Sequence, residues 1–233
     1  MFEAVVLIVT PELTQNEFDA LLPLVSQEKQ DRIKKFRCFQ DAQNCLLGDI
    51  LARVEICRAT GLNCRQIDFS LNPYGKPFLT NSPHIHFNTS HAGHYIACAV
   101  ANTPVGIDIE LMRPIDLKIA QRFFATDEIK YVMDSDQLDR FYEIWTKKES
   151  YVKFDGQGLY KPLFSFSIFD PAERLFYHKI FENEEAICHA CSTTQDKPFV
   201  RVMDTAMLLC SIYNNNLLCN SDLAVAFRKD PNA

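Results

Sequence analysis

Two acidic residues separated by a single residue are the first feature of this sequence that could bind a metal ion. They are Asp108 and Glu110, within the alternating segment Val105–Glu110. If this segment is a strand, both carboxylates and Gly106 share one face, with the two acidic Cα atoms about 6.5–7 Å apart. Such a pair repels itself unless a cation lies between the oxygens, and Mg²⁺ prefers carboxylate and phosphate ligands. The pattern indicates either a Mg²⁺ site or an ordinary strand with a solvated acidic face.

A second candidate group lies on a helix predicted over residues 136–154. Glu149 falls on the apolar stripe of this helix, where a carboxylate is costly unless it is paired, metal-bound or facing a cleft. Lys153 follows four residues later, so a simple intrahelical ion pair is the alternative explanation. With Lys148 nearby and a Gly-Gln-Gly turn at 156–158, the segment indicates a general base beside a phosphate site.

Groups suited to phosphate binding also occur in the first half of the chain. Ser90 and His91 follow a predicted strand and precede a glycine turn, a common position for residues that contact phosphate. Basic residues gather at Lys29, Arg32, Lys34, Lys35 and Arg37, and a further cation lies on the turn Gly75-Lys76-Pro77. In an acidic chain, such a patch favours a phosphorylated small molecule, although a solvated helix face has the same composition.

Other chemistries fit these residues less well. Four histidines between 84 and 94 match no zinc motif, and Cys188 and Cys191 form a CxxC pair without a second pair. Ser90, His91 and Asp108 lack the GxSxG segment of a hydrolase, and adjacent Ser and His do not readily form the required hydrogen bond. Neither a P-loop nor a dinucleotide-binding glycine motif is present.

The composition limits the class of protein. The chain has 233 residues, 47% of them hydrophobic, and a net charge of −6. The acidic charge argues against duplex nucleic-acid binding, and no apolar run approaches the ~18 residues of a membrane span. The nine cysteines are odd in number, and several lie in apolar segments, where Cys acts as a small hydrophobic residue. We therefore expect a reducing, cytoplasmic location.

The strands and helices that must position these groups are predicted in a similar order in each half of the chain. We predict strands at 4–9, 85–88 and 95–100 with a long helix at 41–60, then strands at 105–110, 165–169, 186–191, 199–202 and 223–227 with a long helix at 136–154. The short Ala/Val strands at 96–100 and 223–227 are alike, which is weak evidence for duplication. We predict an α+β fold of two halves with a cleft between them.

In this order and spacing, the pieces resemble Sfp-type 4′-phosphopantetheinyl transferases. The matching motifs are Gly75-Lys76-Pro77, Phe87–His91, Gly106–Glu110, Phe123-Phe124 with Glu128, Trp145–Ser150 with Lys153, and Gly156–Leu159. The resemblance covers residues 20 to 165 and is weaker to the end. It implies two similar α+β halves related by a pseudo-twofold axis, with the active site in the cleft. Residues 1–104 would form the nucleotide-binding half, and 105–233 would carry the metal and catalytic residues.

The resemblance also implies the reaction, a Mg²⁺-dependent transfer of the phosphopantetheine arm of coenzyme A to a serine of an apo carrier protein, releasing adenosine 3′,5′-bisphosphate. Asp108, Glu110 and Glu128 would hold Mg²⁺, and Glu149 would deprotonate the serine. Lys153 and Ser90 would contact the pyrophosphate, His91 with Lys29 and Arg32 the 3′-phosphate, and Gly75-Lys76-Pro77 the adenine. The segment Leu111–Phe124 is similar to the family's carrier-docking region. Because both halves lie in one chain, we expect a monomer.

One position departs from the family pattern. Asn44 precedes Cys45-Leu46-Leu47-Gly48-Asp49, where the family has a basic residue that contacts the 3′-phosphate. Losing a charged contact costs about 1.5–3 kcal/mol of binding energy, unless Lys34 or Lys35 replaces it. This position favours one alternative, a relative that binds coenzyme A or a carrier without turnover. Independently of Asn44, a different Mg²⁺ phosphotransferase that uses nucleoside triphosphates also stays open.

Overall fold

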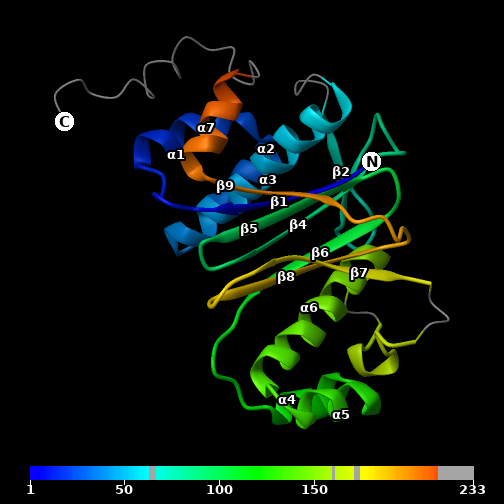
Figure 1. Ribbon diagram of the computed structural model, residues 1–233. Coiled ribbons are helices and arrows are strands. Elements are labelled where there is room, and N and C mark those ends of the chain that lie inside the picture. Colours follow the sequence, from blue (N-terminus) through cyan, green and yellow to red (C-terminus); the bar gives the residue numbers. More distant parts are fainter. Residues whose placement is uncertain (63–66, 159–160, 171–173, 215–233) are drawn as a thin grey trace.

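The fold has four layers, in which two β-sheets pack face to face between two layers of helices (Figure 1). It is seen in a computed structural model that describes residues 1–62, 67–158, 161–170 and 174–214. The strand order is β4-β5-β1-β9 in one sheet and β6-β8-β7 in the other, and β2 and β3 form a separate pair. Helix α3 lies on the outer face of the first sheet and α6 on the outer face of the second.

The elements have the following bounds. The first half contains β1 (Phe2–Ile8), α1 (Gln15–Leu21), η1 (Leu22–Leu24), α2 (Gln27–Ile33), α3 (Phe39–Thr60), β2 (Phe69–Leu71), β3 (Pro77–Leu79), β4 (His86–Ala92) and β5 (Tyr95–Ala101). The second contains β6 (Val105–Leu111), α4 (Lys118–Phe123), α5 (Thr126–Asp134), α6 (Gln137–Asp155), η4 (Leu163–Ser165), β7 (Phe176–Glu182), β8 (Ala186–Ser192), β9 (Phe199–Asp204) and α7 (Thr205–Asn214).

The same strand connection occurs in each half. β1 pairs antiparallel with β5, which pairs antiparallel with β4, and β6, β8 and β7 repeat this arrangement. A long helix follows the first strand each time, α3 after β1 and α6 after β6. The predicted α+β fold of two similar halves is confirmed. The strand that corresponds to β5 is β8, whereas the predicted strand at 223–227 lies outside the described residues.

The last described elements cross back to the first half. β9 runs parallel to β1 at the edge of its sheet, and α7 follows it on the side of α3 (Figure 1). Arg201 of β9 forms an ion pair with the buried Glu55 of α3. The segment 105–233 therefore does not stay together as one half, since its residues 199–214 complete the sheet and helix layer of the other.

One predicted strand is wrong, and three strands, the short pair β2 and β3 and the longer β7, were missed. Residues 165–169 alternate like a strand, but η4 ends at Ser165, and the backbone oxygen of Phe166 accepts a hydrogen bond from Lys148 of α6. This segment packs on α6 and joins neither sheet. β7 was missed because it is an edge strand whose exposed residues break the apolar alternation.

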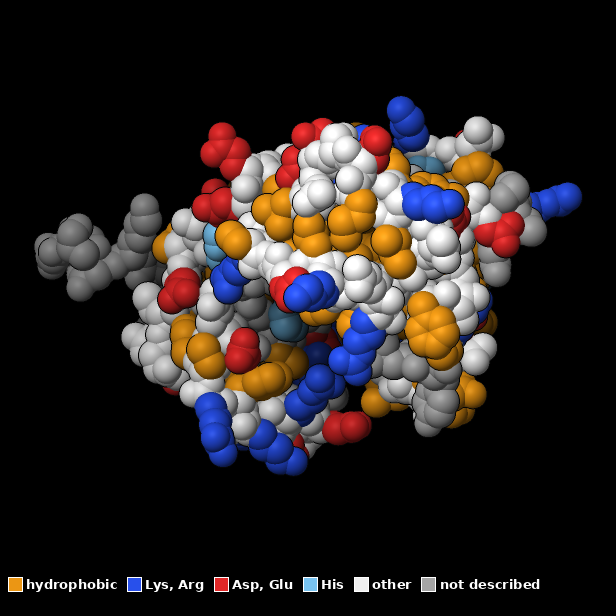
Figure 2. All heavy atoms as spheres, turned by 90° about the horizontal axis from the view of Figure 1, so that it is seen from below, with side chains coloured by type: hydrophobic (Ala, Val, Ile, Leu, Met, Phe, Trp, Pro, Cys, Tyr) orange, Lys and Arg blue, Asp and Glu red, His pale blue; other side chains and the backbone are white. Residues whose placement is uncertain are grey.

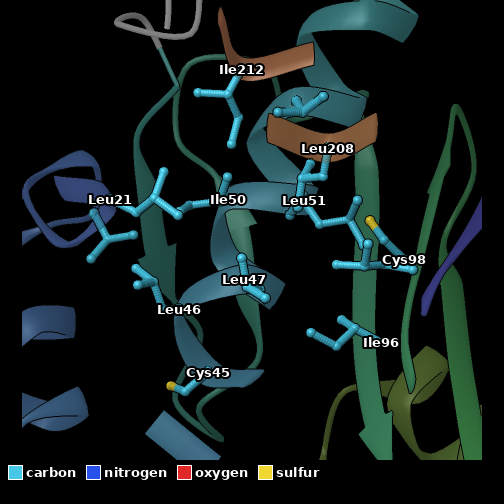
Figure 3. Packing of buried hydrophobic residues seen from close by; sticks show 14 of the residues in the cluster. Leu21, Cys45, Leu46, Leu47, Ile50, Leu51, Ile96, Cys98, Leu208 and Ile212 are labelled. Atoms are coloured by element: carbon cyan, nitrogen blue, oxygen red, sulfur yellow. The ribbon is translucent and has the colours of Figure 1, made fainter. Parts of the chain in front are cut away.

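Apolar clusters between the sheets and beneath the long helices hold the layers together. Between the sheets, the core includes small residues that allow close approach, among them Ala97, Ala99, Ala186 and Ala190. Between α3 and the first sheet, larger side chains interlock. Figure 3 shows Leu47 and Leu51 of α3 on the side that faces Ile96 and Cys98 of β5. Burying a single leucine or isoleucine contributes about 1.5–3 kcal/mol, so the second of these clusters fixes the position of α3. Helix α6 is held by separate clusters that include Phe141, Ile144 and Val152.

The cysteines do not all behave as predicted. Cys45, Cys98, Cys188 and Cys191 form no disulfide and are buried, as expected of small apolar residues, whereas Cys210 is exposed. Cys57 is disulfide-bonded. The premise of fully reduced cysteines is therefore wrong at Cys57, and the cytoplasmic location stays a prediction. Among the helices that the structure describes, none combines the length and apolarity needed to cross a membrane.

Candidate active site

Strand β6 lies directly against helix α6, and Gly106 makes this possible. A Cβ atom at Gly106 would lie 2.0 Å from the backbone oxygen of Ser150 and 2.3 Å from the backbone nitrogen of Phe154. The alternate residues of β6, such as Ile107, belong to the core between the sheets. Gly106, Asp108 and Glu110 share the opposite face, as predicted, so the two carboxylates are carried to the surface of α6.

Three residues of α6, spaced by four, lie along the side of the helix that faces β6. Trp145 Nε1 donates to Glu110 Oε1 at 3.3 Å. Lys153 Nζ donates to Asp108 Oδ1 at 2.6 Å. Glu149 lies between these two residues on the helix and interacts electrostatically with Asp108. The strand and helix motifs, more than 30 positions apart in sequence, therefore form one group.

Strand β4 adds Ser90 from the other half of the molecule. Ser90 Oγ donates to Asp108 Oδ1 at 2.9 Å and accepts from Lys153 Nζ at 2.7 Å. Nearby, Asn88 Oδ1 accepts the backbone N–H of Ile107 at 2.9 Å, which fixes β4 beside β6. We refer to Ser90, Asp108, Glu110, Glu149 and Lys153 as the active-site cluster. It lies where the two halves meet.

The three carboxylates of the cluster repel one another in a partly buried site. Burial, followed by the charges of Asp108 and Glu149, raises the pKa of Glu110 to about 7. Burial also raises the pKa of Glu149, with Asp108 as the second cause, and burial raises the pKa of Asp108 against the opposing effect of Lys153. A site that disfavours its own negative charges gains free energy when it binds a cation.

Asp108 provides a direct test of whether Mg²⁺ fits. Its Oδ1 is hydrogen bonded, whereas its Oδ2 is buried without a hydrogen-bond partner. A buried carboxylate oxygen without a partner is costly, and a bound cation would satisfy it. Among the described residues, no three His, Cys, Asp or Glu form a ready-made metal cluster. The unpartnered Oδ2 of Asp108 fits an ion that takes its other ligands from a phosphate-bearing substrate, as Mg²⁺ commonly does.

Glu128, the third predicted metal ligand, lies elsewhere. Its side chain is fully buried, and Oε1 accepts from Lys148 Nζ at 2.7 Å and from the backbone N–H of Ile168 at 2.8 Å. Oε2 accepts the backbone N–H of Ala125 at 2.7 Å. This carboxylate is already neutralised, so the predicted set is corrected: Glu149, not Glu128, is the third carboxylate beside Asp108 and Glu110. Lys148, which was predicted to flank the phosphate site, is the other member of this ion pair.

The predicted phosphate-binding residues gather around His91. Burial lowers the pKa of His91, and the charges of Lys153, Lys29 and Arg32 lower it further, while Asp41 opposes them. Lys29 Nζ also lies 3.9 Å from the carboxylate of Asp49. Figure 2 shows a hollow on one face of the molecule in which acidic, basic and histidine side chains come together. A positive region next to three carboxylates suits a ligand with several phosphates and a divalent cation.

The turn Gly75-Lys76-Pro77 is tied to the end of α6. Lys76 Nζ donates to the backbone oxygens of Phe154 at 3.1 Å and Val105 at 3.2 Å, and burial lowers its pKa to about 8. Asn72 Nδ2 donates to the backbone oxygen of Gly156 at 2.9 Å. A cation is favourable at the C-terminal end of a helix. The amine of Lys76 therefore caps α6, which leaves the rest of the turn for the predicted contact with adenine.

Asn44 is also occupied within the protein. It is buried, and its Nδ2 donates to the backbone oxygen of Gly93 at 2.7 Å. Gly93 follows His91 in the turn between β4 and β5, so Asn44 supports the loop beside the basic residues. Its Oδ1 is buried without a hydrogen-bond partner. Where the family pattern has a basic side chain that contacts phosphate, Asn44 therefore binds the backbone of the turn between β4 and β5.

Comparison with known proteins gives matches over both halves. Residues 11–103 match the family model "4′-phosphopantetheinyl transferase, N-terminal", and residues 104–207 match "4′-phosphopantetheinyl transferase superfamily". The chain is 43% identical over 159 residues to 4′-phosphopantetheinyl transferase ffp of Bacillus subtilis and 42% identical to Sfp of Bacillus subtilis strain 168, covering in each case 67% of this chain and 71% of the relative. It is 39% identical to gsp of Aneurinibacillus migulanus, over 72% of this chain and 71% of the relative.

Proposed function

Because the chain belongs to the 4′-phosphopantetheinyl transferase superfamily, we propose that it moves the phosphopantetheine arm of coenzyme A to a serine of an apo carrier protein in a Mg²⁺-dependent reaction. The serine oxygen attacks the phosphorus that bears pantetheine, and the bond to the adenosine-side phosphate breaks. Adenosine 3′,5′-bisphosphate leaves. The observation that carries this proposal is the active-site cluster, in which three carboxylates, a lysine and a serine meet between the two halves.

Asp108 and Glu110 are proposed to hold Mg²⁺, with Glu149 as the third carboxylate beside them. Their mutual repulsion and the unsatisfied Oδ2 of Asp108 support this assignment. When bound, the ion neutralises charge on the pyrophosphate and on the leaving group. Glu128 has no part in this set, because its carboxylate is fully paired.

Glu149 and Lys153 are proposed to act on the reacting groups. Glu149 would take the proton of the carrier serine, and its raised pKa makes it a better proton acceptor than an ordinary carboxylate. Lys153 Nζ is held by Ser90 and Asp108, so its charge is already oriented where the pyrophosphate would bind. Such preorganised charge is the main source of catalysis in phosphoryl-type transfer.

His91, Lys29 and Arg32 are proposed to bind the 3′-phosphate. Removing one charged partner costs about 1.5–3 kcal/mol of binding energy. We therefore expect Arg32→Ala to raise the KM for coenzyme A about tenfold or more with little change in kcat, and to leave the KM for dephospho-coenzyme A unchanged. Lys197→Ala, an exposed lysine after β8, is the matched control. An equal rise in KM for both donors would contradict the assignment.

The pH dependence of metal binding provides a second prediction. Glu110 has a pKa of about 7 in the folded protein against 4.5 ordinarily. Between pH 4.5 and 7, Glu110 is therefore more protonated in the folded protein than in the unfolded chain. The free energy by which this proton stabilises the fold is lost as the pH rises through 7. Because Mg²⁺ binds the ionised form, we expect Mg²⁺ to raise the unfolding temperature more at pH 8 than at pH 6.

Scanning calorimetry with and without Mg²⁺ measures this difference. Glu110→Gln should remove most of it, because the neutral amide neither titrates nor attracts the ion. Glu143→Gln, on the same helix as Glu149 but paired with Lys147, is the control and should retain it. If Mg²⁺ raised the unfolding temperature of the unmodified protein equally at pH 6 and pH 8, the role of Glu110 would be contradicted.

The carrier protein is proposed to dock on the segment 111–124. Arg113, Lys118 and Arg122 are exposed along this segment, and Ile119 adds an exposed apolar side chain. Carrier proteins are often acidic, so these cations are suited to them. The segment runs from the end of β6 to the start of α5, next to the active-site cluster.

A transfer assay tests the proposed function. The protein, coenzyme A and Mg²⁺ are incubated with apo carriers of the fatty-acid, polyketide and non-ribosomal peptide types, and intact masses are recorded. We expect one carrier to gain the mass of one phosphopantetheine, and the gain to disappear when a chelator removes the metal. Binding of coenzyme A without a mass gain on any carrier would instead support a non-catalytic relative.

A further inference from the structure

Lys148 and Glu128 form an ion pair with both side chains fully buried, and the proposed reaction does not use either residue. Lys148 Nζ donates to Glu128 Oε1 and to the backbone oxygen of Phe166, both at 2.7 Å. It also lies 4.2 Å from the centre of the Phe166 ring, a favourable distance for a cation–π contact. The ammonium group of this lysine, which can only donate, therefore has these partners inside the protein.

The pair joins three segments. Glu128 lies in the first turn of α5 and accepts the backbone N–H groups of Ala125 and Ile168. Lys148 lies in the middle of α6. A second bond, from Ser167 Oγ to Asp127 Oδ2 at 2.6 Å, reinforces the same junction. The N-terminus of α5, the helix α6 and the segment 166–168 are thus fixed to one another at a single point.

Stability alone does not explain a charged pair at this position. Removing two charges from water is costly, and well-packed apolar residues in their place are often as stable or more stable. Unlike apolar packing, hydrogen bonds with fixed directions define the rotation of a helix about its axis. Glu149 is the next residue after Lys148, about 100° further around α6. When Lys148 is held toward α5, Glu149 and Lys153 face β6.

We infer that Lys148 and Glu128 are positioning residues for the proposed transfer, which set the rotation of α6 so that Glu149 reaches the carrier serine. This inference rests on the proposed function. Lys148 contacts neither Asp108 nor Glu110 in the hydrogen bonds and ion pairs of the described residues. A displacement of about 1 Å at a reacting group is enough to reduce a rate ~10²-fold.

Three variants test the inference. Lys148→Met leaves a buried carboxylate without its partner, so we expect a lower unfolding midpoint in urea and a kcat reduced ~10²-fold per folded molecule, with the KM for coenzyme A within threefold. Adding Glu128→Gln removes the unpaired charge, so the double variant should regain stability. Its kcat should stay ~10²-fold low, because the hydrogen bonds that fix the rotation of α6 are still absent. Lys147→Met, the same change at a partly buried ion pair with Glu143, should behave as the unmodified protein.

The outcomes separate three explanations. If folded Lys148→Met has the kcat of the unmodified protein, the pair is merely structural. If the double variant regains both stability and the kcat of the unmodified protein, the unpaired buried charge caused the loss of rate and the rotation of α6 did not. Either result overturns the inference. When Lys148→Met does not fold, the double variant decides alone, and we expect its kcat to be ~10²-fold below that of the unmodified protein. Failure of the proposed function is distinct, because the unmodified protein would then show no transfer.

Discussion

Replacing Gly106 by alanine is expected to destabilise the protein by about 3 kcal/mol or more and to abolish transfer. The added Cβ would lie 2.0 Å from the backbone oxygen of Ser150 and 2.9 Å from the backbone carbon of Lys153. Backbone atoms cannot rotate away as a side chain can, so β6 and α6 must separate. Asp108 and Glu110 would then move away from Glu149 and Lys153, and a shift of about 1 Å costs ~10²-fold in rate.

Urea unfolding and the carrier transfer assay measure both effects. Gly48→Ala is the matched control, because a Cβ there meets only Ile96 Cγ2 at an ordinary 3.8 Å. In the interior of α3, alanine is favoured over glycine by about 0.5–1 kcal/mol. We expect this control to be as stable as the unmodified protein or more so. A Gly106→Ala protein with unchanged midpoint and activity would contradict the close contact of β6 with α6.

Replacing Glu149 by glutamine is expected to reduce kcat by about 10²–10⁴-fold. The amide has nearly the same shape but cannot accept the proton of the carrier serine. The fold should be retained or slightly stabilised, because the change removes a carboxylate that Asp108 repels. Coenzyme A binding should stay within a few-fold, since Lys153, His91 and the basic residues are unaltered.

Single-turnover kinetics and calorimetric binding of coenzyme A separate these properties. Glu143→Gln is the control, because Glu143 lies on α6 but pairs with Lys147. A Glu149→Gln protein that transfers at the unmodified rate would show that another group accepts the proton. Loss of coenzyme A binding together with transfer would assign Glu149 to ligand binding rather than to proton transfer.

Local periodicity predicted the elements that carry the cluster. The alternation in β6 placed Asp108 and Glu110 on one face, and the apolar stripe of α6 placed Glu149 toward the protein interior. Both depend on neighbours within a few residues, which is the range over which helix and strand periods act. The strand β7 and the crossing of β9 depend on contacts between distant segments, and the sequence pattern carried no signal for them.

The family resemblance assigned Glu128 to the metal, and this error too concerns a contact between distant segments. A carboxylate in the first turn of α5 is equally compatible with a metal site and with an internal ion pair, and the choice is made by Lys148, 20 residues away. One signal for the correct set was present. Trp145, Glu149 and Lys153 recur every four residues, the spacing of one helix face, and this face meets β6. The cap that Lys76 places on α6 joins segments 78 residues apart, beyond the reach of any local pattern.

The central claim is that Asp108 and Glu110, with Glu149 beside them, bind the metal and that Glu128 does not. A crystal of the protein with coenzyme A and Mn²⁺ in place of Mg²⁺ tests it most directly, because Mn²⁺ gives an anomalous signal that locates the ion. We expect a single peak bridging the pyrophosphate and the carboxylates of β6, with Glu128 still bound to Lys148. A peak on Glu128, or a fully occupied coenzyme A pyrophosphate without an ion at β6, would contradict the account.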